Sequence, residues 1–226
     1  MATHFGKARG SAPAHNLDSA GLSKVLRQTY QLLSATLGVT AIAALISQQL
    51  GLPHPGVIIT LVGFYGLLFM IHKTKDSGKS ILFTFLLAAF MGYSLGPILN
   101  SVLHLSNGGT LIANAFLMTA VAFLSLSAYV TRSGKDMSFL GGFLVAGFVV
   151  LLAGVILGMI FQIPGLHLAL SVGFVLFSCA AILFETSAII HGGQTNYVLA
   201  CVSLYVSIYN LFLSLLSILS SFSGNK

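Results

Sequence analysis

Charged residues are scarce in this sequence. Lysine, arginine, aspartate and glutamate together make up 6% of the 226 residues, and only four residues are acidic. Hydrophobic residues make up 56% of the chain, and its mean hydropathy is strongly positive. A water-soluble domain of this length could not hide so much apolar surface in one core. The composition therefore excludes a soluble protein and indicates a membrane protein.

Three other patterns are also missing. The long apolar runs lack the period-two alternation of barrel strands, which favours a helical bundle because a spanning chain must satisfy its backbone hydrogen bonds internally. Cysteine occurs only twice, at Cys179 and Cys201, and the expected depths of the two thiols differ by roughly 12 Å, which is too far for a disulfide. No Lys or Arg falls within an expected span.

Seven apolar stretches are long enough to cross a hydrocarbon core of about 30 Å, which takes about 20 helical residues. We predict an all-α integral membrane fold with transmembrane helices near residues 31–51, 56–72, 80–103, 108–131, 138–162, 166–190 and 198–221. Residues 1–22 are small, polar and aperiodic, which predicts a disordered cytoplasmic tail before a membrane domain at 23–226.

The basic residues sort to the loops of one side. They are Lys7, Arg9, Lys24 and Arg27 before the first span, Lys73, Lys75 and Lys79 after the second, and Arg132 and Lys135 after the fourth. The opposite loops carry none, and Lys226 at the C-terminus is the one basic residue expected on that side. The positive-inside rule then predicts a cytoplasmic N-terminus and a C-terminus outside. Because membrane topology explains the excess of basic over acidic residues, we expect no nucleic-acid partner.

Two spans carry polar stripes. The seventh has Ser203, Ser207, Asn210, Ser214, Ser217 and Ser221, at alternating steps of four and three that keep them on one helix face. The sixth has Ser171, Ser178 and Glu185, at seven-residue steps that also share a face. These seams are explained either by close packing of small residues or by a hydrated, ion-accessible crevice. Spacing alone does not separate the two explanations.

Small residues also pair at four-residue steps in two other spans. Gly92 and Gly96 in the third span, and Gly154 and Gly158 in the fifth, predict close approach between helix backbones. Pro97 directly follows Gly96 and predicts a kink or a local break in the third span.

Glu185 is the acidic residue expected inside a span. Counted from the cytoplasmic turn it lies about 9 Å deep, level with Ser203 and Ser207 at about 8 and 14 Å. A carboxylate there must face the interior, find a partner or stay protonated. The available partners are hydroxyls, Asn210, the tyrosines, and His72 or His191 near the boundary. This pattern predicts that Glu185, with Ser207 and Asn210, senses protons or ions and couples protonation to opening of the last two spans.

Catalytic patterns are absent. An intramembrane aspartyl mechanism needs two carboxylates that share a proton, and a zinc protease needs H-E-x-x-H. His54, His104 and His167 all fall at outer helix ends, where interfacial polar residues are ordinary. We therefore expect no enzymatic activity, no metal site and no cofactor.

Several long stretches resemble a known family. They are GYSLGPILN in the third span, RSGKDMSFLGG before the fifth, LFETSAIIHGGQTNYV across the end of the sixth, and SLYVSIYNLFLSLLSIL in the seventh. In this order they are similar to the Bax inhibitor family, and in particular to its bacterial inner-membrane members, from about Val25 to the end of the seventh span. The resemblance implies that six transmembrane helices surround a central seventh, a place that the polar seam of that span also favours.

The resemblance implies two activities. One is to bind and restrain the membrane AAA protease FtsH, within an assembly that includes HflK and HflC, and so to affect quality control of membrane proteins such as SecY. The alternative is a pH-sensitive cation (calcium) leak, attributed in the family to an acid in each of the last two helices. Glu185 matches the first acid, but Ser207 stands at the second position, which makes a poor site for calcium. The resemblance also implies a location in the bacterial inner membrane, with a periplasmic C-terminus.

Overall fold

The computed structural model describes residues 19–161, 163 and 165–223, and the described chain is helical apart from short loops. Its helices are α1 (Ser19–Gln49), α2 (Val57–Lys73), α3 (Lys79–Leu103), α4 (Gly108–Ser133), α5 (Leu140–Ile160), α6 (Leu166–Ile190) and α7 (Tyr197–Ser223). The prediction of seven helices is confirmed. Six of those described are long and apolar enough to cross a membrane, whereas α2, with 17 residues, is a shorter apolar helix.

The first helix starts much earlier than predicted. α1 begins at Ser19 rather than near residue 31, so residues 19–22 of the predicted tail belong to a helix. Its first turns are amphipathic, with Lys24 and Arg27 exposed and Thr29 buried. An apolar run marks only the membrane-embedded part of a helix, whereas an amphipathic face can continue it beyond the boundary. The rest of the predicted tail, residues 1–18, lies outside the described residues.

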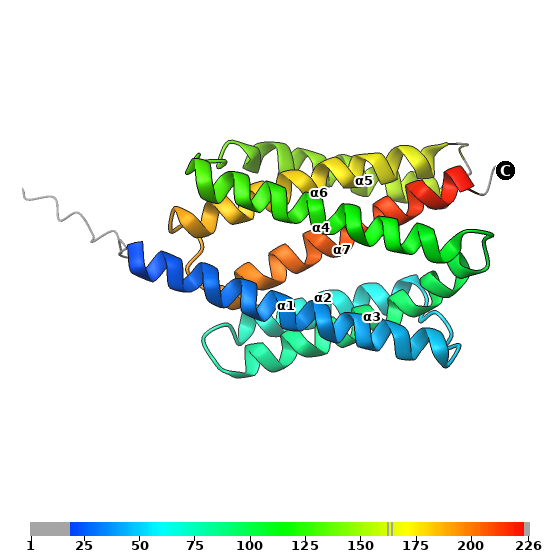
Figure 1. Ribbon diagram of the computed structural model, residues 1–226, viewed down its shortest axis with the longest axis horizontal. Coiled ribbons are helices and arrows are strands. Elements are labelled where there is room, and N and C mark those ends of the chain that lie inside the picture. Colours follow the sequence, from blue (N-terminus) through cyan, green and yellow to red (C-terminus); the bar gives the residue numbers. More distant parts are fainter. Residues whose placement is uncertain (1–18, 162, 164, 224–226) are drawn as a thin grey trace, which may run out of the picture.

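The helices form two groups of three with α7 between them (Figure 1). In one group α3 packs on α1 and α2, and in the other α6 packs on α4 and α5. α7 contacts α1, α3, α4 and α6 and is the most buried of the long spans. α2 and α5 lie at the outer sides of their groups. Polar residues of α7 are therefore placed to meet both groups.

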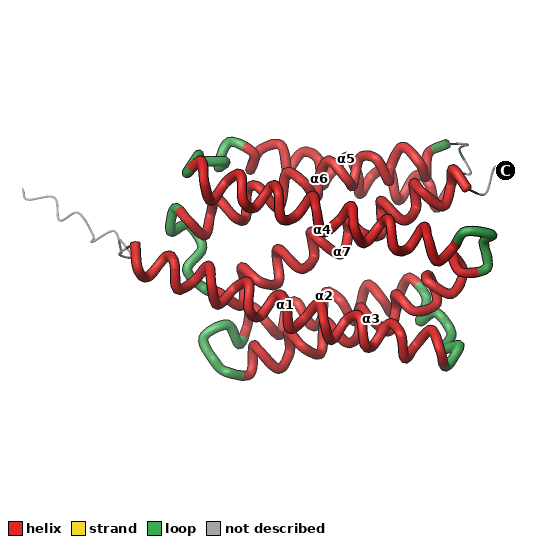
Figure 2. Tube along the Cα trace, in the orientation of Figure 1, coloured by secondary structure: helices red, strands yellow, loops and turns green. Residues whose placement is uncertain are grey.

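The loops gather at the two ends of the bundle (Figure 2). The end at which α1 begins also holds the α2–α3, α4–α5 and α6–α7 connections. Seven basic side chains of the described residues lie at or near this end: Lys24, Arg27, Lys73, Lys75, Lys79, Arg132 and Lys135. The described residues of the opposite loops contain no Lys or Arg. The bundle thus has one basic end and one end without basic residues in its described part.

Glycines bring α3 close to α1. A Cβ built on Gly96 would lie 2.5 Å from Cβ of Ser47, and one built on Gly92 would collide with the carbonyl oxygen of Thr40 and lie 2.8 Å from Cβ of Ala43. The predicted close approach is therefore confirmed for this pair. α3 also runs through Pro97 without a break.

The second glycine pair acts differently. A Cβ on Gly154 would lie 2.5 Å from Cδ2 of Leu170, and one on Gly158 would lie 3.4 Å from Cδ2 of Leu166. These neighbours are the ends of leucine side chains on α6. The pair therefore receives side chains from α6, and the predicted close approach of backbones is wrong for α5.

Hydroxyl groups cross between α1, α3 and α7. Oγ1 of Thr40 lies 3.1 Å from the Ala88 carbonyl oxygen on α3 and 2.8 Å from the Tyr205 hydroxyl on α7. The Ser47 hydroxyl donates to the Tyr93 carbonyl at 2.9 Å, and the Tyr209 hydroxyl donates to a carbonyl of α3 at 3.3 Å. Such bonds and small-residue contacts are what hold helices together in lipid, where burial of carbon adds little.

Replacing Gly92 by alanine tests the α1–α3 contact. The added methyl group collides with the backbone of α1, so we expect the free energy of unfolding to fall by about 1–3 kcal/mol. Gly38→Ala is the matched control, because the space around its Cβ is open and alanine favours a helix by up to about 1 kcal/mol over glycine. Thermal unfolding in detergent, followed by circular dichroism, measures both. Equal effects would contradict the close contact.

Candidate functional site

The structure brings Glu185 together with Ser203 between α6 and α7. Glu185 is partly buried about one turn before the end of α6, and the Ser203 hydroxyl lies near its carboxyl group. Ser203 is also partly buried, near the start of α7. Helix α6 ends and α7 begins at the basic end of the bundle, so this pair lies at the same depth on both helices.

Ser207 and Asn210 are not drawn into that contact. Ser207 is buried, and its hydroxyl donates to the Ser203 carbonyl of its own helix at 3.0 Å. Among the described residues, Ser207 makes no hydrogen bond to Glu185. Asn210 is partly buried and lies about 10 Å along α7 from Ser203, given a rise of about 1.5 Å per residue. The structure therefore does not gather the predicted group of three around Glu185, and Ser203 occupies the place beside the glutamate.

The two seams meet again at the other end of the bundle. The hydroxyl oxygens of Ser171 on α6 and Ser217 on α7 lie 2.9 Å apart. Nδ1 of His167 lies 3.4 Å from the Ser217 hydroxyl, and the Ser171 hydroxyl also lies 2.9 Å from the His167 carbonyl oxygen. Ser214 is buried one turn deeper. Helices α6 and α7 are thus joined by polar contacts near both ends.

The middle of the seam differs from its ends. Ser178 is completely buried, and its hydroxyl has no hydrogen-bond partner among the described residues. An unsatisfied buried hydroxyl costs about 1–3 kcal/mol. The ends of the α6–α7 interface are therefore packed and hydrogen-bonded, whereas its middle keeps an unpaired polar group.

A second polar cluster ties the α4–α5 loop to the end of α6. The Ser187 hydroxyl accepts a hydrogen bond of 2.9 Å from the buried backbone N–H of Met137. Nε2 of His191 lies 3.1 Å from the Gly134 carbonyl oxygen, and its Nδ1 lies 2.9 Å from the Ser187 carbonyl oxygen. Sequence reasoning missed this cluster. Its one local signal was the polar stretch RSGKDMS followed later by TSAIIH, and spacing cannot show that these stretches meet.

Asp136 stabilises the same α4–α5 loop through hydrogen bonds within the loop. The backbone N–H and the hydroxyl of Ser138 donate to its two carboxylate oxygens at 2.9 and 3.1 Å. These bonds favour the ionised form and lower the pKa of Asp136 from its ordinary value, with a smaller contribution from His191. Because the pKa of Asp136 is lowered, its ionised carboxylate stabilises the loop at any pH above the ordinary pKa of aspartate. This stabilisation is lost as the pH falls through the lowered pKa.

Other candidate partners of Glu185 are used elsewhere. His191 faces the α4–α5 loop, Nδ1 of His72 lies 2.9 Å from the Leu68 carbonyl oxygen of its own helix, and Tyr205 bonds to Thr40. Both cysteines are free, with Cys201 buried. Within the part of the chain that the structure describes, no three His, Cys, Asp or Glu side chains gather as a metal ion would require.

Polar groups inside this bundle join α7 to its neighbours and also join other helices to each other. The chain is a multi-pass helical membrane protein. It belongs to the Bax inhibitor family, because the sequence signature described as "Inhibitor of apoptosis-promoting Bax1" matches residues 22–224. The resemblance seen in the sequence is confirmed.

Individual relatives cover almost the same range. The chain is 57% identical over 197 residues to "Modulator of FtsH protease YccA" of Escherichia coli (strain K12), which covers 87% of this chain and 89% of that protein. It is 56% identical over 204 residues to an uncharacterized protein of Pseudomonas aeruginosa, and this match covers 90% of this chain and 92% of that protein. A membrane protein of Vibrio cholerae is 39% identical over 204 residues.

Ser187→Ala tests the loop anchor. The substitution leaves the buried N–H of Met137 without a partner, so we expect unfolding to become easier by about 1–3 kcal/mol and the Met137 amide to exchange hydrogen faster. Ser125→Ala is the control, because that exposed hydroxyl bonds only to carbonyls of its own helix. Hydrogen exchange with mass spectrometry measures the change. Unaltered protection of the loop would show that Ser187 does not anchor it.

Proposed function

We propose that this protein modulates the membrane protease FtsH. The observation that carries the proposal is its 57% identity, over 197 residues, to a protein named as a modulator of that protease. The matched range covers most of the helical bundle, so the surface offered to a protease is expected to be largely shared. HflK and HflC are proposed as further members of the assembly.

In this proposal the protein lies in the bacterial inner membrane, with its basic end and N-terminus in the cytoplasm and its C-terminus in the periplasm. The one-sided charge distribution supports this orientation. α7 is proposed as the central helix that the other six surround, which its burial and its four packed neighbours support. The surrounding lipid is an obligatory partner of the exposed apolar faces.

The protein is proposed to act by binding and not by catalysis. A processive ATPase must hold an end of its substrate before it pulls, and the residues that precede α1 would supply that end in the cytoplasm. The glycine contacts and hydroxyl bonds between α1 and α3 would then resist extraction of the first helix. Protease bound to this slow substrate would be restrained from acting on others.

Affinity purification from the native membrane tests the proposal. We expect FtsH, identified by mass spectrometry, to be recovered with the wild-type protein and equally with Glu185→Gln, because the glutamate lies between α6 and α7 rather than on a contact surface. Deletion of residues 2–18 should reduce recovery several-fold while leaving α1 complete. If FtsH is absent from all three preparations, the proposal is wrong. If the deletion changes nothing, the protease does not use this end.

The alternative function is a pH-sensitive cation leak between α6 and α7. Two observations favour it: Glu185 lies partly buried at the interface beside Ser203, and the Ser178 hydroxyl farther along α6 is buried without a partner. Ser207 at the second position lacks a carboxylate. The site therefore offers fewer oxygen ligands than calcium prefers.

Flux measured in proteoliposomes tests the leak. If it exists, lowering the pH should change the flux of monovalent cations through the wild type, and Glu185→Gln should abolish that pH dependence, whereas Glu185→Asp should keep it. Ser207→Asp adds the second carboxylate and should raise calcium flux several-fold. Wild-type protein that passes neither ion at any pH would rule out the leak.

A further inference from the structure

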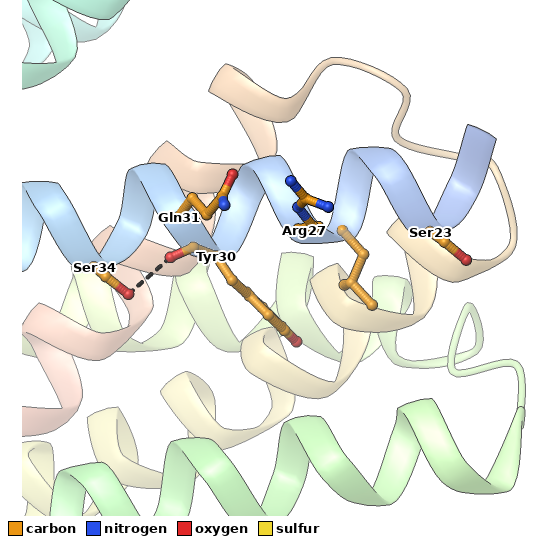
Figure 3. A pocket seen from close by; sticks show the side chains of 6 residues that line it. Ser23, Arg27, Tyr30, Gln31 and Ser34 are labelled. Carbon is orange, nitrogen blue, oxygen red and sulfur yellow. Dashed lines mark hydrogen bonds between the residues drawn. The ribbon is translucent and has the colours of Figure 1, made fainter. Parts of the chain in front are cut away.

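A groove of about 410 Å³ runs between α1 and α4 toward the basic end of the bundle. These two helices are not closely packed on each other. Tyr30 of α1 spans the space, with its hydroxyl against the Ser127 hydroxyl and its ring edge-on to that of Phe123, 6.0 Å between ring centres. A hollow of about 480 Å³ on α1 shares Tyr30 and Ser34 with this groove (Figure 3). Together they form one continuous surface, called here the α1–α4 groove.

The α1–α4 groove has an arginine from each helix. Arg27 lines its α1 side and Arg132 its α4 side, and both are exposed. Among residues 19–161, 163 and 165–223, no acidic residue lines it. The acidic residues of the described chain lie elsewhere: Asp76 in the α2–α3 loop, Asp136 in the α4–α5 loop and Glu185 beside Ser203. Two cations therefore line the groove without a carboxylate from the described part of the chain to neutralise them there.

The lining changes from charged to apolar with depth. Gln31, Thr131 and the apolar Leu26 adjoin the arginines. The deeper part is lined by Leu33, Leu37, Phe123 and Leu124, with the Ser34 hydroxyl among them. From Arg27 to Leu37 the groove follows α1 for about 15 Å. It opens sideways toward lipid, since Leu124 on its wall is 64% exposed. Cations at the membrane surface, then hydroxyls, then an apolar channel follow the order of phosphate, ester and acyl chain in a phospholipid.

We propose that the α1–α4 groove binds one anionic phospholipid of the leaflet at the basic end, with its phosphate between Arg27 and Arg132 and one acyl chain along the apolar part. Basic pockets between membrane helices select anionic headgroups, and guanidinium groups suit phosphate oxygens. A zwitterionic lipid brings its own cation and gains less from the two arginines.

Native mass spectrometry of the purified protein tests this, with phosphatidylglycerol and phosphatidylcholine as probes. We expect wild-type protein to bind one phosphatidylglycerol in preference to phosphatidylcholine. The double substitution Arg27→Gln with Arg132→Gln should weaken the binding of phosphatidylglycerol about tenfold or more. It should also abolish the preference for phosphatidylglycerol over phosphatidylcholine. Lys73→Gln with Lys79→Gln is the matched control, because it removes the same charge from the same end of the bundle at α2 and α3. That control should bind as the wild type does.

A third variant separates the groove from the surface around it. Ala128 is exposed and lines the groove. Ala128→Trp should therefore block the place of the acyl chain and weaken the binding of phosphatidylglycerol, although both arginines are kept. Glycerol 3-phosphate, which has no acyl chains, should not displace the lipid. The proposal is overturned if the lysine control loses as much affinity as the arginine variant, if Ala128→Trp binds normally, or if glycerol 3-phosphate competes on equal terms. Circular dichroism checks that each variant is folded.

Discussion

Close contact between small and hydroxyl-bearing residues is the constraint on which this bundle depends. Lipid tails are as apolar as leucine, so helices gain little by turning leucines toward each other. α1 and α3 instead approach until only glycine fits at residues 92 and 96. At that distance Thr40 and Ser47 reach backbone carbonyls of α3. The hydroxyl bonds therefore depend on the close approach that the two glycines allow.

α7 extends this arrangement to both halves of the molecule. On one side its tyrosines bond to α1 and α3, and on the other its serines meet Glu185 and Ser171 of α6. The first set consists of hydroxyl groups and backbone carbonyls. The second set includes a carboxyl group, whose bonding changes with protonation. Any response of this protein to protons is thus expected in the contact between α7 and α6 rather than in that between α7 and α1.

Much of the fold follows from the sequence, because apolar runs and one-sided charge are direct consequences of the bilayer. The stripe of α7 and the depth of Glu185 follow from helix geometry alone. The early start of α1 does not, since its amphipathic turns lie beyond the apolar run. The sequence also does not predict that the Met137 amide bonds to Ser187, or that Ser203 rather than Ser207 lies beside Glu185. These depend on how two helices are rotated about their axes and on the path of a loop, which spacing within one element does not determine.

The short second helix has a consequence for the membrane itself. With 17 residues, α2 is about 25 Å long, whereas the hydrocarbon core is about 30 Å thick. It lies at the outer side of its group, packed on α3, so lipid must adapt to it. A bilayer accommodates a short helix by thinning nearby. The molecule is therefore expected to be surrounded by a lipid annulus of uneven thickness, and neighbours with short transmembrane segments should gather preferentially beside α2.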